Sequence, residues 1–342
     1  MANIIFSGSI NSALRCQEWA VELWHVHNRD QFFYHFTSDS GSNIVHEKKD
    51  FTKTAGYQMT EGLRMQFLSD GVINDEILES NEEAPDFYSL TWTISQLRNA
   101  GRYAGEETQQ YTKYNLPSEI KDGLGEWMSN KRDKDKFTAL ATSPTKVIYV
   151  NSRAGTSTVA AGDLMTLTTL SYAKTYAKST AYPKIPPIKL TKIGQQTVYK
   201  YVVLMHDHVS YDLAVNDPVY QQVARDAGER GTNNALFSGA LIDWQGMVLY
   251  DHDNCPTVTT WGAGSNIAGA ESYLLGKQAL IAGIGGYKMS GKNGYLKWVE
   301  KKFDYDNGFG VAVGIIKGDA KSVFNSKDYS VITLRSARTN VS

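Results

Sequence analysis

The most constraining feature of this sequence is a pair of alternating segments joined by a long connector. Leu63, Met65 and Phe67 alternate with polar residues, and the stretch 88–95 alternates apolar and polar side chains without a break. Such a period of two is typical of half-buried antiparallel strands. The connector at 69–86 is too long for a tight turn, and a lone two-stranded ribbon is marginally stable in water. We therefore expect this ribbon to lie on another surface.

The connector carries charge of one sign. No lysine or arginine occurs between Met65 and Leu97. The acidic residues of that stretch are Asp70, Asp75, Glu76, Glu79, Glu82, Glu83 and Asp86. One interpretation is a solvated loop, and the other is a tip that docks on a basic patch of another chain. For the second, we predict that Glu79, Glu82 and Glu83 contact basic residues such as Lys131 or Arg132, although Asp133 and Asp135 dilute that patch.

Near the start of the chain, apolar residues recur at helical spacing. Cys16, Trp19, Ala20, Leu23 and Trp24 predict a helix from about 12 to 26 with one apolar stripe. That stripe needs a partner, so Trp19, Leu23 and Trp24 are predicted contact residues. The following stretch, 28–54, has no sustained period and is interpreted as an extended arm with little core of its own.

The rest of the chain mixes helical and strand patterns, which predicts an α+β fold. Residues 106–140 are helical in pattern, with Pro117 near a helix start and Ile120, Leu124, Trp127 and Met128 on one stripe. Beyond Pro144 we expect strands at 146–150, 197–205, 247–251, 308–318 and 328–336. We expect helices at 163–179, 218–227 and 271–282.

Composition narrows the partners. The chain has 342 residues, 42% of them hydrophobic, and a formal net charge of −1, so no global basic field holds nucleic acid. Any contact with DNA is expected to be local and weak. Cys16 and Cys255 are interpreted as buried thiols of a reducing compartment. No secretion signal is recognised, and no apolar run reaches the length of about 18 residues that suggests a membrane span.

Two polar clusters raise the question of catalysis. His206 and His208 follow one expected strand, and Asp251 and His252 follow another, so a metal-assisted hydrolase using these residues is one alternative function. Their spacing fits no metal motif, and capping or hydrogen bonding is the favoured interpretation. No nucleophile elbow or phosphate-binding loop is recognised. We therefore predict that the chain has no catalytic residue, cofactor or metal ligand. We also predict that it is not an enzyme.

Several short motifs resemble the major capsid proteins of tailed bacteriophages, in the group typified by the N-four-like phages. The loop positions that match are Gly71, Val72, Asp75, Leu78, Glu79, Asn81, Glu82 and Glu83, and the following strand matches at Ile94, Gln96 and Arg98. Further matches are Leu124 and Trp127, the segment 204–213, the segment 230–240, and Asp328, Val331 and Ile332. Departures occur at Tyr57, Ser80 and Ala235, which put the turn geometry in doubt rather than the resemblance.

The resemblance implies the Hong-Kong-97-type capsid fold. On that template residues 1–55 form an N-terminal arm, 56–104 an extended loop, 105–145 with 300–342 a peripheral domain with a long spine helix, and 146–299 an axial domain. It also implies self-assembly into hexamers and pentamers of an icosahedral head in the virion, built in the host cytoplasm around double-stranded DNA. The resemblance further implies portal, decoration and scaffolding proteins as partners. It implies no contact with a membrane. A compartment shell of the encapsulin kind is the other alternative.

Overall fold

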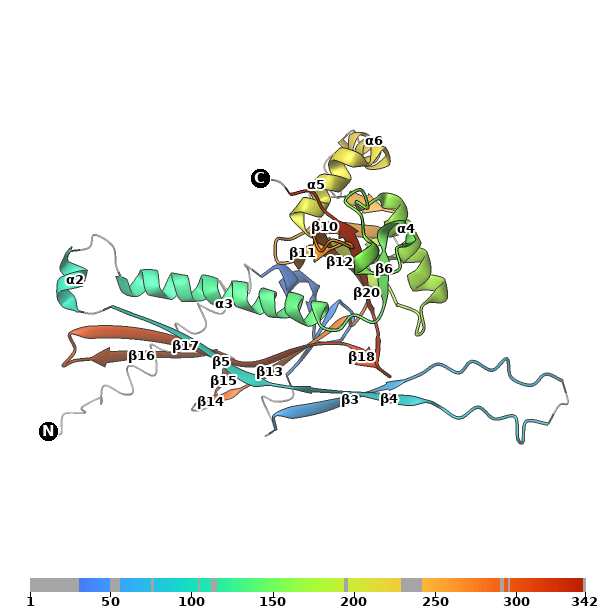
Figure 1. Cartoon of the computed structure of the whole chain (residues 1–342). Helices are drawn as coiled ribbons and strands as arrows, with labels where there is room; N and C mark the ends of the chain where they lie inside the picture. Colours follow the sequence, from blue (N-terminus) through green and yellow to red (C-terminus); the bar gives the residue numbers. More distant parts are fainter. Residues whose placement is uncertain are drawn as a thin grey trace. The chain divides into compact units, whose positions relative to one another are not determined.

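The computed structural model describes residues 31–49, 56–74, 77–103, 105–111, 116–193, 196–228, 242–289, 292–294 and 296–340. Helices and strands are mixed along the chain, as expected from the sequence (Figure 1). The chain divides into two compact units. The first unit comprises 1–57, 93–140 and 280–320, and the second comprises 58–92, 141–279 and 321–342.

The first unit is built on a six-stranded sheet. Its strands are β1 (Thr37–Ser38), β2 (Val45–Lys48), β5 (Ser95–Tyr103), β13 (Leu280–Gly285), β16 (Leu296–Phe303) and β17 (Gly308–Lys321). The order is β1-β2-β13-β17-β16, and β5 also pairs with β17. The long strand β17 is antiparallel to both β5 and β16. A short pair, β14 (Tyr287–Met289) and β15 (Lys292–Gly294), completes the strands of this unit.

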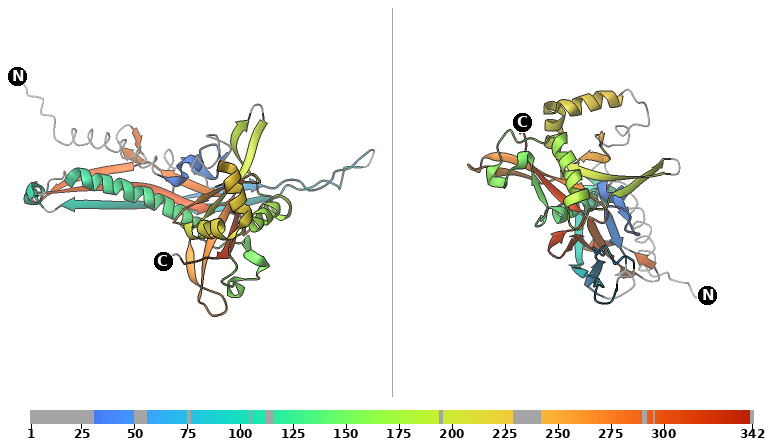
Figure 2. Two further views of the ribbon diagram at one scale, coloured as in Figure 1. Left: turned by 90° about the horizontal axis from the view of Figure 1, so that it is seen from above. Right: turned by 90° about the vertical axis from the view of Figure 1, so that its right-hand side faces the viewer.

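A long helix, α3 (Leu116–Ala141), lies along one face of this sheet, after the short helix α2 (Glu106–Tyr111) (Figures 1 and 2). It begins beside Pro117, and the predicted stripe is confirmed: Leu124 and Met128 are buried, with Ile120 and Trp127 packed beside them. The sheet contributes Trp298, Val311, Val313 and Ile315, among others, to the same cluster. None of the described helices is long and apolar enough to cross a membrane.

The segment 31–49 contributes to the core, so the prediction of an arm with little core was wrong for these residues. Phe33, Ile44 and Val45 are fully buried, and β2 pairs in parallel with β13. Phe33 lies in the 3₁₀ helix η1 (Phe32–Phe36), with its ring 5.1 Å from that of Phe137 on α3. Pattern analysis missed this packing because the buried residues are too few and irregularly spaced to show a period.

The second unit is built on a mixed eight-stranded sheet. Its strands are β6 (Val147–Tyr149), β7 (Ile188–Ile193), β8 (Gln196–Met205), β9 (Ile242–Trp244), β10 (Met247–Asp251), β11 (Thr257–Trp261), β12 (Ile267–Leu275) and β20 (Val331–Ala337). The order is β6-β20-β12-β8-β10-β9, while β11 pairs with β12 and β7 with β8. A short pair, β18 (Val323–Phe324) and β19 (Lys327–Asp328), lies outside this sheet.

Short helices accompany this sheet. They are α4 (Leu167–Thr175) with the π-helical turn η5 (Tyr176–Thr180), α5 (Asp207–Asn216) and α6 (Pro218–Gly228), with 3₁₀ turns η3 (Val150–Ser152) and η4 (Thr156–Thr158). Apolar side chains of α4 and α5, such as Leu170 and Val209, join those of β8, β10 and β20 in one buried cluster. The expected strands at 146–150, 197–205 and 247–251, and the expected helix at 218–227, are therefore confirmed.

The alternating segments form a ribbon of β3 (Gln58–Arg64) and β4 (Phe87–Thr93), which pair with each other. Along β4, exposed residues alternate with Tyr88, Leu90 and Trp92, of which only Trp92 is buried. The pairing begins earlier than the pattern suggested, because β3 ends at Arg64 and the expected strand residue Phe67 lies in the connector. So little burial gives the ribbon almost no core of its own.

Two expectations from the sequence need correction. The stretch 271–282, expected to be a helix, instead covers parts of β12 and β13. Every residue of these strands from Gly269 onward is buried, so both faces of each strand are covered. A strand covered on both faces shows a continuous apolar run, which cannot be distinguished from a buried helix by period alone.

The domain boundaries also differ from those expected. Residues 321–342 group with the second unit, because β20 pairs with β12 and β6, and 280–299 group with the first. Residues 93–103, expected in the extended loop, belong to the first unit through β5. Strand partners distant in the sequence decide these boundaries, so local composition does not reveal them.

We predict that Gly318→Ala destabilises the subunit by about 1–3 kcal/mol, the usual cost of overpacking a core. A Cβ at Gly318 would lie 2.1 Å from the backbone oxygen of Thr93, where β4 leads into β5, so β17 would have to shift. Urea unfolding of the unassembled subunit measures the change. Gly62→Ala on β3 is the matched control, because a Cβ there meets nothing within 4 Å. Equal midpoints for the two variants would contradict the prediction.

Candidate assembly surface

The connector between β3 and β4, which we call the acidic loop (residues 65–86), runs out as two adjacent arms (Figure 1). The arms are held together near their base by a backbone bond from Met65 N to Asp86 O, 2.9 Å long. Farther out, the Glu83 carboxylate accepts hydrogen bonds from the backbone N–H of Leu68 at 2.8 Å and of Ser69 at 2.7 Å. These bonds, Ser69 first and Leu68 second, lower the pKa of Glu83. Glu83 therefore acts as a clasp within the loop.

Most of the other described residues of the acidic loop face solvent. Glu79 and Glu82 are exposed, although the Glu82 carboxylate accepts a bond of 2.7 Å from the backbone N–H of Ser80. Large apolar side chains of the loop and of Phe87 beside it are 52–72% exposed: Phe67, Leu68, Ile73, Ile77, Leu78 and Phe87. Apolar side chains gathered on a segment without a core are typical of an interaction surface. The loop is thus both acidic and apolar on its outside.

The expected basic patch on α3 is not formed as the sequence suggested. Lys131 is partly exposed but bonds to Asp135 of the same helix at 2.6 Å. Arg132 is 6% exposed, and its Nη2 lies 4.0 Å from Oε1 of Glu47 in the same unit. Burial lowers the pKa of Arg132, an effect that nearby carboxylates oppose. The interpretation of Arg132 as a residue that faces another chain was therefore wrong.

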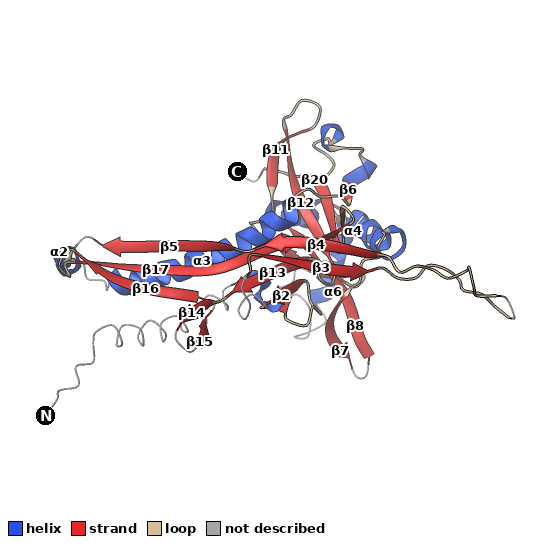
Figure 3. Cartoon of the chain, turned by 90° about the horizontal axis from the view of Figure 1, so that it is seen from below, coloured by secondary structure: helices blue, strands red, loops and turns tan. Residues whose placement is uncertain are grey.

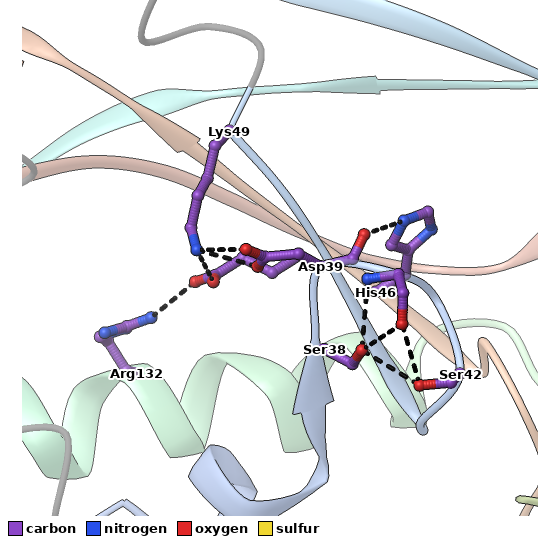
Figure 4. A network of polar contacts seen from close by, with 8 residues as sticks. Ser38, Asp39, Ser42, His46, Lys49 and Arg132 are labelled. Carbon is purple, nitrogen blue, oxygen red and sulfur yellow. Dashed lines mark hydrogen bonds and ion pairs between the residues drawn. The ribbon is translucent and has the colours of Figure 1, made fainter.

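Arg132 instead belongs to a polar network that ties the segment 37–49 to α3 (Figure 4). The Lys49 ammonium donates to both carboxylate oxygens of Asp39 at 2.8 and 2.9 Å, and it lies 3.0 Å from Glu47, the partner of Arg132. Burial lowers the pKa of Lys49, but the bonds to Asp39 and Glu47 outweigh it and raise the pKa. This network is structural, since its charges satisfy one another within one chain.

Figure 3 shows the sheet face of β5, β17 and β16 that points away from α3. The strand registers place several cations on this face. Arg98 and Lys297 lie opposite Gly314, on the two sides of β17, and Arg102 and Lys301 likewise flank Gly310. Directly opposed residues of antiparallel strands point to the same face. All four cations are exposed. We call this surface, with Arg98, Arg102, Lys297 and Lys301, the basic sheet face.

The basic sheet face carries charge of one sign. Among the paired residues of the three strands, no carboxylate lies on it: its other members are Gln96, Ala100, Val299, Phe303, Ala312 and Ile316, with the glycines. The acidic side chain of β16, Glu300, lies near Lys121 of α3 on the other face. This surface was not predicted from the sequence, although its cations stand four residues apart in each of two strands. The pairing of β5 with β16 through β17 could not be foreseen.

The histidine and aspartate clusters lie at the same end of the sheet, after the carboxyl ends of β8 and β10, because these two strands are parallel neighbours. His206 caps α5, with its Nδ1 accepting the N–H of His208 at 3.1 Å, which confirms the expected capping role. Burial, and then the neighbouring His208, lower the pKa of His206. Asp251 accepts a bond from Ser210, and His252 one from the N–H of Asn254.

These residues do not converge on a common point. Within the part of the chain that the structure describes, no group of three or more histidine, cysteine or acidic side chains is arranged to hold a metal ion. Cys255 is buried, as expected, and burial raises the pKa of its thiol. The alternative of a metal-assisted hydrolase thus gains no support from the geometry. Trp19, Leu23, Trp24 and Cys16 lie outside the described residues.

Known proteins resemble this chain along almost its whole length. A family model described as "Phage capsid protein" matches residues 8–339. The major capsid protein of Pseudomonas phage KPP25 is 26% identical over 369 aligned residues, covering 92% of this chain and 93% of that protein.

Solved structures agree. The capsid of Ralstonia phage GP4 has a TM-score of 0.79 at 23% identity, covering 91% of this chain and 92% of that chain. The Cyanophage Pam1 capsid asymmetric unit has a TM-score of 0.73 at 17% identity, covering 90% and 92%. The α+β fold of the Hong-Kong-97 type is thereby confirmed. Given the family match over nearly all of its residues, this chain belongs to the phage capsid protein family.

Proposed function

We propose that this chain is the major subunit of a tailed-phage head and assembles with itself into hexamers and pentamers of an icosahedral shell. The family match and the capsid fold support this role. Many copies of one modest contact can hold such a shell, because closure makes the loss of one subunit require breaking several contacts. The proposal includes assembly in the host cytoplasm around double-stranded DNA.

The observation that carries the proposal is the exposed ribbon with its acidic loop. A segment whose large apolar side chains are more than half exposed gains little from its own fold, and a partner that covers them would gain about 25 cal/mol for each Å² of apolar surface buried. The Glu83 clasp keeps the two arms together before any partner arrives, which lowers the entropy cost of docking. The loop is thus suited to bind a neighbouring subunit.

The formal net charge of −1 suits a wall that encloses DNA without binding it tightly. Portal, scaffolding and decoration proteins are included as partners on the basis of the resemblance. Negative-stain electron microscopy of the purified protein tests the central claim. Closed shells or rings of five and six subunits support the proposal, and dispersed monomers across a range of protein and salt concentrations would contradict it.

We predict that Glu83→Gln loosens the acidic loop without unfolding the subunit. The neutral amide offers one acceptor oxygen and no charge where the carboxylate offers two charged ones. Amide hydrogen exchange at Leu68 and Ser69 should accelerate, shell yield should fall, and the urea midpoint should stay unchanged. Glu79→Gln is the matched control for the exchange measurement alone, since its exposed carboxylate takes no part in the clasp. Unchanged exchange at both amides in Glu83→Gln would argue against a clasp.

The clasp should also respond to pH. The pKa of Glu83 in the folded loop is lower than its ordinary value of 4.5, so the clasp contributes order at pH above 4.5. That contribution is lost as the pH falls through the lowered folded value. The Leu68 and Ser69 amides of the parent chain should therefore be better protected from exchange than those of Glu83→Gln at pH 5 to 7. In stronger acid the parent should lose that extra protection. Protection that persists after full protonation would contradict this assignment.

We predict a shell held together by non-covalent contacts. The region 56–104 contains no lysine, so the ribbon and its loop offer no amine for an isopeptide bond to a neighbour. Denaturing electrophoresis of mature particles should give one band near the subunit mass of 38.0 kDa. A ladder of covalent multimers would show the prediction to be wrong.

A further inference from the structure

A hollow of about 660 Å³ lies in the second unit, between β6 and α4, which are neighbours in both Figure 1 and Figure 3. Its walls come from β6, from the turn η3 that follows it, and from α4 with the start of η5. We call it the tyrosine pocket, after its lining residues Tyr149, Tyr172 and Tyr176. Hollows of this size are typical of sites for small-molecule ligands.

The tyrosine pocket has no unpaired charge. Among the described residues that line it, the one charged side chain is Arg153, which donates to both carboxylate oxygens of the buried Asp163 at 2.7 and 3.2 Å. On the helix side, the Asp217 carboxylate accepts the N–H of Leu167 at 2.8 Å, so the positive end of the α4 dipole already has an anion. A charged ligand of either sign would therefore lose its hydration without gaining a partner of opposite charge.

The pocket does offer groups for hydrogen bonds. The hydroxyls of Ser152, Thr168, Tyr172 and Tyr176 have no hydrogen-bond partner in the described part of the chain. The amide nitrogen of Asn151 donates to Asp163 at 2.7 Å, which leaves the amide oxygen to accept from a ligand. Because a hydroxyl both donates and accepts, a ligand that itself carries several hydroxyls can pair with these groups in either direction.

The tyrosine rings supply apolar surface beside these hydroxyls. Tyr172 and Tyr176 are four residues apart, so they lie on one side of the helical segment. The Tyr149 side chain is fixed by a buried chain of contacts: its hydroxyl accepts from Arg335 at 3.0 Å, and Arg335 lies 2.7 Å from Glu271. Each ring combines an apolar body with a polar tip. A sugar ring has the same division, with C–H groups on its faces and hydroxyls at its edge.

We propose that the tyrosine pocket binds a short neutral saccharide. The sugar packs its C–H faces on the exposed ring of Tyr172 and the neighbouring ring of Tyr176. Its hydroxyls bond to those of Ser152 and Thr168 and to the amide oxygen of Asn151. This site belongs to a single chain, so it is independent of the contacts by which subunits assemble.

Two other classes of ligand fit this pocket less well. A phosphate group or nucleic acid needs an unpaired cation, and Arg153 is already paired with Asp163. An extended peptide would pair with the outer edge of β6, but that strand has only three residues, Val147–Tyr149, so few backbone bonds can form. A peptide backbone would also leave most of the unpaired hydroxyls without partners.

Saturation-transfer NMR of the full, unassembled chain tests the proposal with three neutral probes: maltotriose, mannotriose and tri-N-acetylchitotriose. At least one probe should bind, and Tyr172→Ala should lower its affinity about tenfold, because the sugar loses the ring on which it packs. Tyr172 is 61% exposed, so this change removes little of the core. Tyr199→Ala is the matched control: Tyr199 is 60% exposed, lies on β8 outside the pocket, and should be dispensable for binding.

Two further variants separate the ring from the hydroxyls. Tyr172→Phe keeps the ring and removes its hydroxyl, so its affinity should fall between that of the parent and that of Tyr172→Ala. Thr168→Val removes a hydroxyl at nearly the same volume and should also weaken binding. Urea midpoints equal to that of the parent establish that each variant folds.

Several outcomes would overturn the proposal. One is that none of the three probes binds the parent chain. Another is that a probe binds but is affected equally by Tyr172→Ala and Tyr199→Ala, or by neither, which would place the sugar elsewhere. Binding of inorganic phosphate, or of a neutral Gly-Ser hexapeptide, in place of the sugars would assign the pocket to an anion or to a protein segment. Since the measurement uses the unassembled chain, a failure to form shells leaves its result unchanged.

Discussion

The first unit depends on two different kinds of contact made by α3. In the first half of the helix, Leu124 and Met128 are buried against β16 and β17, and full burial of such a side chain contributes about 1.5–3 kcal/mol. In the second half, charged side chains are buried: Arg132 beside Glu47, Asp133 accepting the N–H of Phe32 at 2.7 Å, and Lys136 over the ring of Phe33. The apolar half supplies stability, and the charged half fixes the segment that crosses it.

The buried charges of this second half add little net stability, because desolvation offsets most of the attraction between them. Burial, and then the neighbouring Arg132, lower the pKa of Lys136 to about 8, which shows how strongly the site opposes an additional positive charge. Removing one partner would leave another charge buried and unpaired, at a cost of about 3–5 kcal/mol. Residues 32–49 are therefore held at one position along α3, and β2 is brought into register with β13.

With α3 covering one face of the sheet, the other face is left to carry cations. The same element, β17, serves both faces: Val311, Val313 and Ile315 point to the helix, and the small residues between them separate the two rows of cations. The second unit buries its own apolar cluster and leaves the ribbon exposed. Among the described residues, each unit thus has a buried core of its own, and the first exposes the basic sheet face while the second exposes the acidic loop.

The sequence by itself determined the local features. The period of two at 88–95, the stripe from Ile120 to Met128 and the capping role of His206 could be predicted because each depends on neighbours in the sequence. The acidic charge of the loop and the resemblance to phage capsid proteins could also be read directly. Helix and strand could not be distinguished at 271–282, where both faces of a strand are covered and the pattern loses its period.

Only the tertiary structure decided which charges face outward. Arg132 and Arg98 are the same residue type, but Arg132 is buried beside Glu47 and Arg98 is exposed on β5. The difference comes from partners far along the chain. Glu47 lies 85 positions before Arg132, and Gly314, the β17 residue opposite Arg98, lies 216 positions after Arg98. The role of Glu83 also depends on the folded loop. In the sequence it is one of seven acidic residues between Met65 and Leu97, and only the folded loop brings its carboxylate to the backbone N–H groups of Leu68 and Ser69. A pattern of neighbouring residues carries no information about such contacts, because long-range pairing creates them.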